Sequence, residues 1–363
     1  MFLSHFTYDD YPYYLHEDRV FTDYLSALKA CSTARQVRSI KMYAWDDEIA
    51  KIKWWEEPPL PLAHYFKERA QQLRDMYSYL RLYVSGGYDS YYALRAFLDN
   101  DIHLDEIVHT RNDYTQTGDY WADIEYHEQF VKIIEKHRTQ LHDTKITVLS
   151  PDYLNIFSKE TNVFEYTDTP ACMVSSPMFM SNFTNINFRD EANIWSHPKT
   201  DVRCIDGEYY FVFPSYEFMA YAPNTVCFYI SKHYFDLYLK QAHMIMRYLQ
   251  LNPNPICHQD LVAAATGNPY FNEHQSKNYS DMNVFKPESR ARVFPLSKGK
   301  IYFRAKALLK HGAESKRVYD IWKEYMIDTY SKRHLLDSRQ VTLYRVNSPF
   351  YNLNSREIKY EKE

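Results

Sequence analysis

The spacing of apolar residues between positions 62 and 150 alternates between two patterns. Helical spacing, with apolar residues three and four apart, covers 62–80 and 122–141, and a further helix is expected at 90–99. Short apolar runs typical of buried strands lie beside these helices, at 81–85, 105–110 and 145–150. The order is strand–helix–strand–helix–strand, with connections long enough for right-handed crossovers. It predicts an α/β fold in which flanking helices cover a parallel sheet.

The pattern beyond residue 150 is less regular. Alternating apolar residues over 202–213 surround Asp206-Gly207, a favourable two-residue turn, and predict a β-hairpin. Helices are expected at 231–250, 303–311 and 315–333. We therefore expect three parts, which are an aromatic N-terminal segment (1–60), an α/β domain (61–260) with the hairpin as an insertion, and a mostly helical C-terminal region (261–363).

Composition narrows the class of protein. The chain has 363 residues, a formal net charge of −4 and 25% charged residues, values typical of a globular protein. No apolar run is long enough for a membrane span, and the first residues lack the pattern of a secretion signal. Five cysteines lie far apart, with no pair separated by two residues, which favours buried reduced thiols. We expect a cytoplasmic protein without a membrane partner.

Two of only seven glycines, Gly86 and Gly87, stand side by side directly after the first predicted strand. A tight turn explains one of them, because glycine adopts a positive φ without strain, and Asp89 or Ser90 can cap the following helix. A phosphate-binding loop explains both, since amides without side chains approach phosphate oxygens closely and the helix N-terminus is partly positive. Ser85 and Ser90 would add hydroxyl donors.

Two familiar phosphate loops are missing. The chain has no GxxxxGK[ST] segment and no GxGxxG segment, so neither a P-loop nor a dinucleotide-binding turn is supported. In open parallel sheets, ligands bind beyond the carboxyl ends of the strands where the strand order reverses. The glycine turn follows a strand and so occupies such a position.

Ser85-Gly86-Gly87-Tyr88-Asp89-Ser90 resembles the SGGxDS motif of the PP-loop superfamily, the N-type ATP pyrophosphatases, which includes the synthetase domain of asparagine synthetase. The resemblance covers residues 62–155. It implies cleavage of ATP to AMP and pyrophosphate, with the adenylyl group passed to a carboxylate or carbonyl oxygen that an amine or similar nucleophile then attacks. It also implies that Ser85, Gly86, Gly87 and Ser90 hold the pyrophosphate end, and that Asp89 is catalytic and faces the phosphates through Mg²⁺.

Departures from the family leave the substrate open. Residue 2 is Phe, so the nucleophilic cysteine of glutamine-dependent asparagine synthetases is missing, and nitrogen would come from ammonia, an amine or a partner. The second acidic glycine motif of asparagine synthetase is not recognisable, because the segment around Asp206-Gly207 fits a hairpin better. A small-molecule substrate, a tRNA or nucleobase substrate, and a non-catalytic nucleotide-binding scaffold all stay open, as does the oligomeric state.

Two further features bear on partners. Thr110 and Arg111 end the second predicted strand, where the resemblance implies the adenine pocket, although an ordinary strand end explains them equally well. Residues 286–317 carry ten Lys or Arg against two Glu. Such a segment is commonly a solvated helix face, but it could also bind a nucleic-acid backbone or clamp pyrophosphate.

Overall fold

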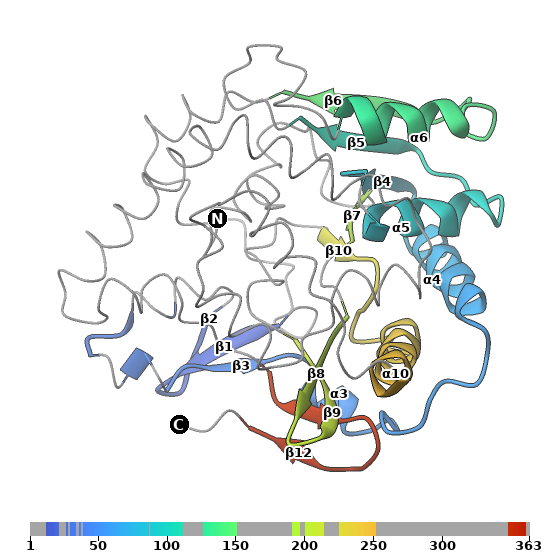
Figure 1. The fold of residues 1–363 in the computed structure, drawn as a ribbon. Coiled ribbons are helices and arrows are strands. Elements are labelled where there is room, and N and C mark those ends of the chain that lie inside the picture. Colours follow the sequence, from blue (N-terminus) through green and yellow to red (C-terminus); the bar gives the residue numbers. More distant parts are fainter. Residues whose placement is uncertain are drawn as a thin grey trace, which may run out of the picture.

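A computed structural model describes residues 12–21, 27, 30–33, 36, 37, 39–86, 88–111, 126–150, 191–196, 200–213, 225–251 and 348–360. Figure 1 shows that these residues form a parallel sheet with helices packed beside it, together with two smaller antiparallel sheets. The expected α/β character is therefore present. The helices expected at 303–311 and 315–333 lie outside the described residues.

The central sheet has five parallel strands in the order β10-β7-β4-β5-β6. The strands are β4 (Tyr79–Tyr83), β5 (Glu106–Thr110), β6 (Lys145–Leu149), β7 (Glu191–Trp195) and β10 (Thr225–Cys227). Leu82 of β4 lies opposite Ile107 in β5 and Ile194 in β7. The three strands expected from sequence are β4, β5 and β6, whereas β7 and β10 come from stretches where the pattern predicts no strand.

The helices of the described chain differ from the expected ones mainly at their ends. Besides the short helix α3 (Asp46–Ile49), they are α4 (Leu62–Met76), α5 (Tyr88–Leu98), η2 (Tyr126–Phe130), α6 (Val131–Lys136) and α10 (Asp236–Leu251). The helix expected over 62–80 ends at Met76, because Tyr77 has an extended backbone and β4 begins at Tyr79. The helix expected over 122–141 is a π-helix, η2, that continues into α6.

One face of the sheet packs against helices α4 and α5. Alternation along β4 directs Leu80 and Leu82 to this face, where they join Phe66 of α4 and Phe97 of α5 in one buried cluster. Full burial of such a side chain contributes about 1.5–3 kcal/mol. This packing fixes the start of α5 relative to the end of β4, and thereby the path of the glycine turn between them.

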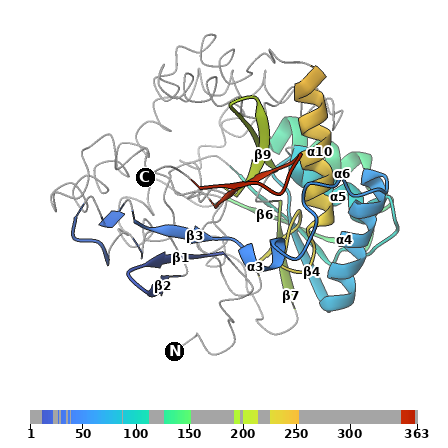
Figure 2. The ribbon, with the colours of Figure 1, turned by 90° about the horizontal axis from the view of Figure 1, so that it is seen from below.

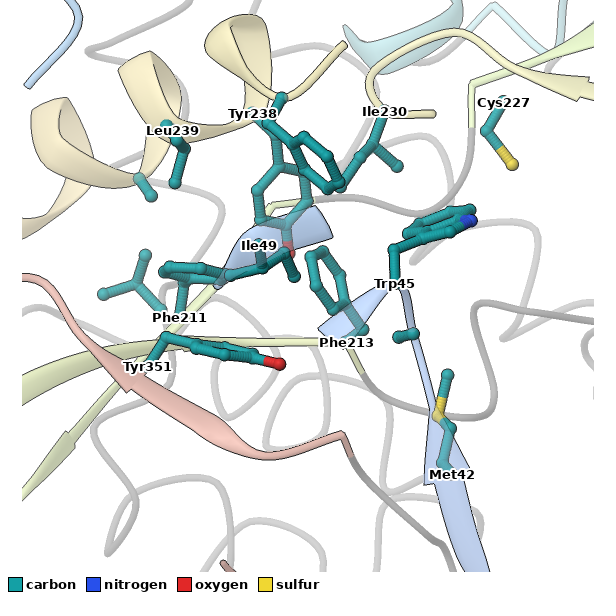
Figure 3. Packing of buried hydrophobic residues seen from close by; sticks show 14 of the residues in the cluster. Met42, Trp45, Ile49, Phe211, Phe213, Cys227, Ile230, Tyr238, Leu239 and Tyr351 are labelled. Atoms are coloured by element: carbon teal, nitrogen blue, oxygen red, sulfur yellow. The ribbon is translucent and has the colours of Figure 1, made fainter. Parts of the chain in front are cut away.

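Aromatic side chains from distant parts of the chain form the second hydrophobic cluster (Figure 3). It joins Tyr83 at the end of β4 to Trp45 of the N-terminal segment and to Phe213 and Tyr351. The hydroxyl group of Tyr351 donates a 2.7 Å hydrogen bond to Oδ1 of Asp46. Asp46 begins the short helix α3 (Asp46–Ile49), so this bond ties the N-terminal segment to the end of the chain.

The other two sheets are antiparallel. One has the order β2-β1-β3 and contains β1 (Tyr13–His16), β2 (Arg19–Phe21) and β3 (Lys41–Tyr43). The other has the order β12-β11-β9-β8 and contains β8 (Asp201–Ile205), β9 (Glu208–Val212), β11 (Phe350–Asn352) and β12 (Ile358–Lys359). The expected hairpin is β8–β9, and both turn residues have a positive φ, 55° for Asp206 and 86° for Gly207.

The last strands belong to a region expected to be mostly helical. Its described part, 348–360, forms β11 and β12, and β11 pairs with β9 of the hairpin. Figure 2 shows β11 and β12 in red beside β9. The hairpin is thus part of a sheet completed by the C-terminal end of the chain.

A buried ionic group links the parallel strands near their amino ends. Nε of Arg81 lies 2.7 Å from Oε2 of Glu106, and Nη1 of Arg81 lies 3.0 Å from Oδ1 of Asn193. Burial raises the pKa of Glu106, but hydrogen bonds from Thr147, Arg81 and Lys145 outweigh burial and lower this pKa to about 2. Glu106 is therefore a charged carboxylate at neutral pH, and its charge is balanced within the sheet.

Candidate phosphate-binding site

The glycine turn lies where the strand order reverses. From β4 the chain passes to β5 and β6 on one side, and the next strands, β7 and β10, lie on the other side of β4. The crossovers on the two sides of β4 therefore run in opposite directions, and sheets with such a reversal bind ligands there, beyond the carboxyl ends of the strands. Residues 84–86 leave β4 at this point. The turn thus occupies the position at which sheets of this kind bind ligands.

Gly86 is needed for the fold of the turn itself. Its φ is +81°, a conformation that residues with a side chain adopt only with strain. A Cβ atom built on Gly86 would also lie 2.8 Å from Cβ of Gln129 in η2, which is closer than real atoms approach. Close packing against the π-helix therefore accounts for Gly86. Gly87, which a turn alone does not explain, lies outside the described residues.

The two serines of the motif are brought together. The main-chain N–H of Ser85 donates a 3.2 Å hydrogen bond to Oγ of Ser90, and the two Oγ atoms lie 3.3 Å apart. Ser90 is buried, whereas Ser85 is exposed. Ser90 thus holds the two ends of the turn together, and Ser85 is the more exposed of the two serines.

Asp89 lies in the first turn of α5, which begins at Tyr88 and has 11 residues. The aligned peptide dipoles of a helix of this length leave partial positive charge at its start. The Asp89 side chain is partly exposed. Its main-chain carbonyl accepts a 2.7 Å hydrogen bond from the hydroxyl group of Tyr229, a buried residue after β10. The start of α5 is therefore held by a residue that follows the edge strand β10.

Thr110 and Arg111 lie at the same edge of the sheet, at the end of β5, the strand next to β4. Both are partly exposed. The main-chain N–H of Arg111 donates a 2.8 Å hydrogen bond to the carbonyl of Leu149, and its guanidinium carbon lies 5.0 Å from the ring centre of Tyr126. The sheet thus brings the two groups of motif residues to adjacent strand ends.

Sequence reasoning missed His109, which positions the turn. Its Nδ1 atom lies 2.8 Å from the carbonyl oxygen of Val84, the residue before Ser85. Because a carbonyl oxygen only accepts, this nitrogen carries the proton and donates. His109 is buried and stacks on Phe130, with ring centres 4.3 Å apart. A histidine in the apolar run of β5 is the signal that could have identified it.

Sequence reasoning also missed the end of β7. Trp195 stacks on Tyr83, with ring centres 4.0 Å apart and planes 16° from parallel. Ser196 follows it, is 6% exposed, and its Oγ has no hydrogen-bond partner among the described residues. A buried hydroxyl without a partner costs about 1–3 kcal/mol. Ser196 is therefore a further buried polar group at the end of β7, the strand that pairs with β4.

If Mg²⁺ binds at the turn as expected, one side chain would hold it rather than several protein ligands. Within the described part of the chain, no group of three or more His, Cys, Asp or Glu residues could hold a metal ion. Magnesium bound with nucleotides needs only one or two carboxylates, because phosphates and water supply its other oxygen ligands. Asp89, in the first helical turn after the glycines, matches that requirement.

The remaining expectations about partners concern a membrane and a nucleic acid. None of the helices in the described ranges is long and apolar enough to cross a membrane. The basic segment 286–317 lies outside the described residues, so its role stays a prediction from sequence.

Comparison with known proteins returns no match, either to a family model, to a curated protein or to a solved structure.

Proposed function

We propose that the chain is an Mg-ATP-dependent adenylating enzyme of the PP-loop type. The observation that carries the proposal is the position of the SGGxDS segment. It leaves the central strand β4 where the strand order reverses, and α5 begins at Tyr88 within the motif. A resemblance of six residues combined with this position is far more specific than either feature alone.

The proposed roles follow from the chemistry of each group. Ser85, which is exposed, and the start of α5 would donate hydrogen bonds to the pyrophosphate end of ATP. Ser90 supports them by holding the Ser85 amide. Gly86 and Gly87 keep side chains out of the turn. Mg²⁺ held by Asp89 would offset the negative charge on the departing pyrophosphate.

The bond cleaved is the one between the α- and β-phosphates. The turn has no lysine that could grip a terminal phosphate, so its donors suit pyrophosphate as the leaving group. A carboxylate or carbonyl oxygen of the substrate would attack the α-phosphorus and receive the adenylyl group. An amine or similar nucleophile would then displace AMP. We favour a small molecule as the substrate, with a tRNA or nucleobase substrate as the alternative.

The test is the identity of the nucleotide product. ATP labelled in the α-phosphate is incubated with the protein, Mg²⁺ and pools of carboxylate metabolites or tRNA, and the products are separated by chromatography. We expect labelled AMP or an adenylylated acceptor, with pyrophosphate released. Labelled ADP would contradict the proposal. ATP binding without turnover in any pool would instead favour a non-catalytic nucleotide-binding scaffold.

A further inference from the structure

Arg69 of α4 is a buried cation that donates hydrogen bonds to uncharged oxygens. Its side chain belongs to a residue that is only 2% exposed. Its Nε lies 2.9 Å from the carbonyl oxygen of Phe228, its Nη2 lies 2.7 Å from that of Cys227, and its Nη1 donates to Oε1 of Gln72. Burial lowers the pKa of Arg69 to about 10, so the guanidinium group still carries its charge at neutral pH. A buried charge therefore holds two consecutive carbonyl groups of the main chain.

These carbonyl groups belong to the segment that leaves β10 at the edge of the sheet. Cys227 is the last residue of β10, and the N–H of Phe228 donates a 2.8 Å hydrogen bond to the carbonyl of the last residue of β7. The segment is thus held by β7 through an N–H group and by Arg69 through its carbonyl groups. Tyr229 comes next, and its hydroxyl group donates to the carbonyl of Asp89 in the first turn of α5. Arg69 is therefore connected to the start of α5 through three consecutive residues.

We propose that Arg69 is a positioning residue for the phosphate site. The inference rests on the proposed function, because it assumes that the phosphates lie at the start of α5. Arg69 acts through Tyr229, since its rigid fork of N–H groups fixes the path of the main chain after β10 and thereby the place of the Tyr229 hydroxyl. A helix start binds phosphate only when its N–H groups point at the phosphate oxygens, so a small shift of the first turn weakens binding.

Apolar packing alone does not explain an arginine at this position. Phe66 and Leu73, one helical turn away on either side of Arg69, belong to the buried apolar cluster, where a Leu or Met would fit the surroundings. Burial of a charge is costly and persists where hydrogen bonds offset the cost. An apolar side chain would take a donor away from two carbonyl groups of buried residues, and Lys would offer a point charge in place of the fork. Position 69 thus requires two donors at a fixed separation.

A double-mutant cycle distinguishes positioning from a contribution to stability alone. Mg-ATP is titrated by calorimetry into the wild type, Arg69→Lys, Tyr229→Phe and the double variant, at a temperature at which all four are folded. Arg69→Lys keeps the charge and loses the fork. We expect each single variant to bind ATP about fivefold more weakly, which corresponds to one hydrogen bond, and the double variant to bind no more weakly than Tyr229→Phe. A purely structural arginine would lower the free energy of unfolding and leave ATP affinity unchanged.

Arg74→Lys is the matched control on the same helix. Nη1 of Arg74 lies 2.7 Å from Oδ2 of Asp105, and Nη2 lies 2.6 Å from the carbonyl oxygen of Tyr77, next to the amino ends of β5 and β4. Arg74→Lys also replaces a fork by a point charge, but at the opposite end of these strands from the turn. It should therefore keep wild-type ATP affinity.

Gln72→Leu is a milder variant that decides the test if Arg69→Lys does not fold. Gln72 is partly buried and accepts the third hydrogen bond of Arg69, so its loss loosens the guanidinium group without removing it. ATP affinity should fall about twofold in the wild-type background and not at all in the Tyr229→Phe background.

The outcomes separate the two proposals. If the wild type binds no ATP, the proposed function is wrong and the inference about Arg69 falls with it. If the wild type binds ATP and Arg69→Lys binds it equally well, Arg69 is not a positioning residue, while the phosphate site stands. Unchanged affinity in Gln72→Leu has the same meaning where Arg69→Lys does not fold. Losses that add up to about 25-fold in the double variant would show that Arg69 acts independently of Tyr229, which would also overturn the inference.

Discussion

The phenol oxygen of Tyr229 lies 2.7 Å from the main-chain carbonyl oxygen of Asp89, although the two residues are 140 positions apart. Tyr229 follows β10 and Asp89 lies in the first turn of α5, so the bond joins one edge of the parallel sheet to the helix behind the glycine turn. The orientation of that helix start therefore depends on a residue outside the motif.

Removing the Tyr229 hydroxyl tests whether the start of α5 depends on this hydrogen bond. Tyr229→Phe keeps the buried ring and loses one hydrogen bond, so we expect the free energy of unfolding to fall by about 1 kcal/mol. ATP affinity should also fall several-fold, because the first turn of α5 is no longer held. Urea denaturation and calorimetric titration measure the two effects.

Tyr234→Phe is the matched control. The hydroxyl of Tyr234 donates a 2.8 Å hydrogen bond to the carbonyl of Tyr65 in α4, away from the turn. The same chemical change should lower stability there by a similar amount and leave ATP affinity unchanged. Equal ATP affinity in both variants would show that Tyr229 contributes stability alone.

The alternation of strands and helices over residues 62–150 could be predicted because each element carries its own apolar period. The lateral order of the strands could not. Nothing in the local pattern says that β7 pairs with β4 rather than with β6, since both edges were available. Strands of three or four residues, such as β1 and β3, are too short to show a period. The turn at Asp206-Gly207 was predictable because its residue types alone favour it.

In the candidate site, too, some contacts could be predicted from the sequence and others could not. The contact between Ser85 and Ser90 spans five residues, so a motif can encode it. The bonds from His109 to Val84 and from Tyr229 to Asp89 span 25 and 140 residues and exist only after the sheet has formed. The π-helix was predicted as an ordinary helix, because a single wide turn barely changes the apolar spacing.

Gly86→Ala should be markedly more destabilising than Gly207→Ala. Both glycines have a positive φ, 81° and 86°, so both variants bear a backbone strain of roughly 1–3 kcal/mol. Only at Gly86 would the new Cβ meet another atom, Cβ of Gln129 at 2.8 Å, whereas nothing lies within 4 Å of the position at Gly207. Crowding adds a further cost of about 1–3 kcal/mol. Thermal denaturation of the two variants measures the difference, and equal losses would show that η2 does not pack on the turn.

Glu106 predicts how stability depends on pH. Its pKa is lowered to about 2 in the folded chain, below its ordinary value of 4.5, so folding favours the charged carboxylate. The stabilisation is complete above the unfolded pKa and is lost as the pH falls from about 5 towards 2. Urea denaturation across this range should show a falling free energy of unfolding.

Glu106→Gln isolates that contribution. The variant removes the closer of the two carboxylates that pair with buried Arg81 and leaves Glu191, whose Oε2 lies 3.3 Å from Nη1, so we expect a loss below the roughly 3–5 kcal/mol of a fully uncompensated buried charge at pH 7. The difference from the wild type should shrink as the pH approaches 2, because the wild-type carboxylate is then protonated too. Glu56→Gln removes the carboxylate of an exposed pair with Lys53 and should cost at most about 1 kcal/mol. A pH-independent difference for Glu106→Gln would contradict the assignment.

The basic segment 286–317 would bind nucleic acid if its Lys and Arg side chains contact the phosphates of the backbone. Changing Lys300, Arg304 and Lys306 to Glu should then abolish binding to tRNA, and wild-type binding should weaken steeply with salt. Filter binding at several salt concentrations measures both. Retained binding in the variant, or none in the wild type at low salt, would remove the tRNA alternative. Lost ATP turnover without a change in tRNA binding would indicate a pyrophosphate clamp.

Asp89→Asn tests the catalytic assignment most directly. The amide keeps the shape of the carboxylate and can still accept hydrogen bonds at the start of α5, so the variant should fold with a loss of about 0.3–1 kcal/mol from the weaker helix-dipole interaction. The charge that would hold Mg²⁺ is removed, so turnover should fall by about 100-fold or more while ATP affinity weakens less. Asp99→Asn is the control, because Asp99 follows the other end of the same helix and pairs with Arg95 in an exposed ion pair. Asp99→Asn should keep wild-type turnover. If Asp89→Asn also turns ATP over at the wild-type rate, the assigned role of Asp89 is wrong. Other residues then bind the metal and offset the charge on the leaving group.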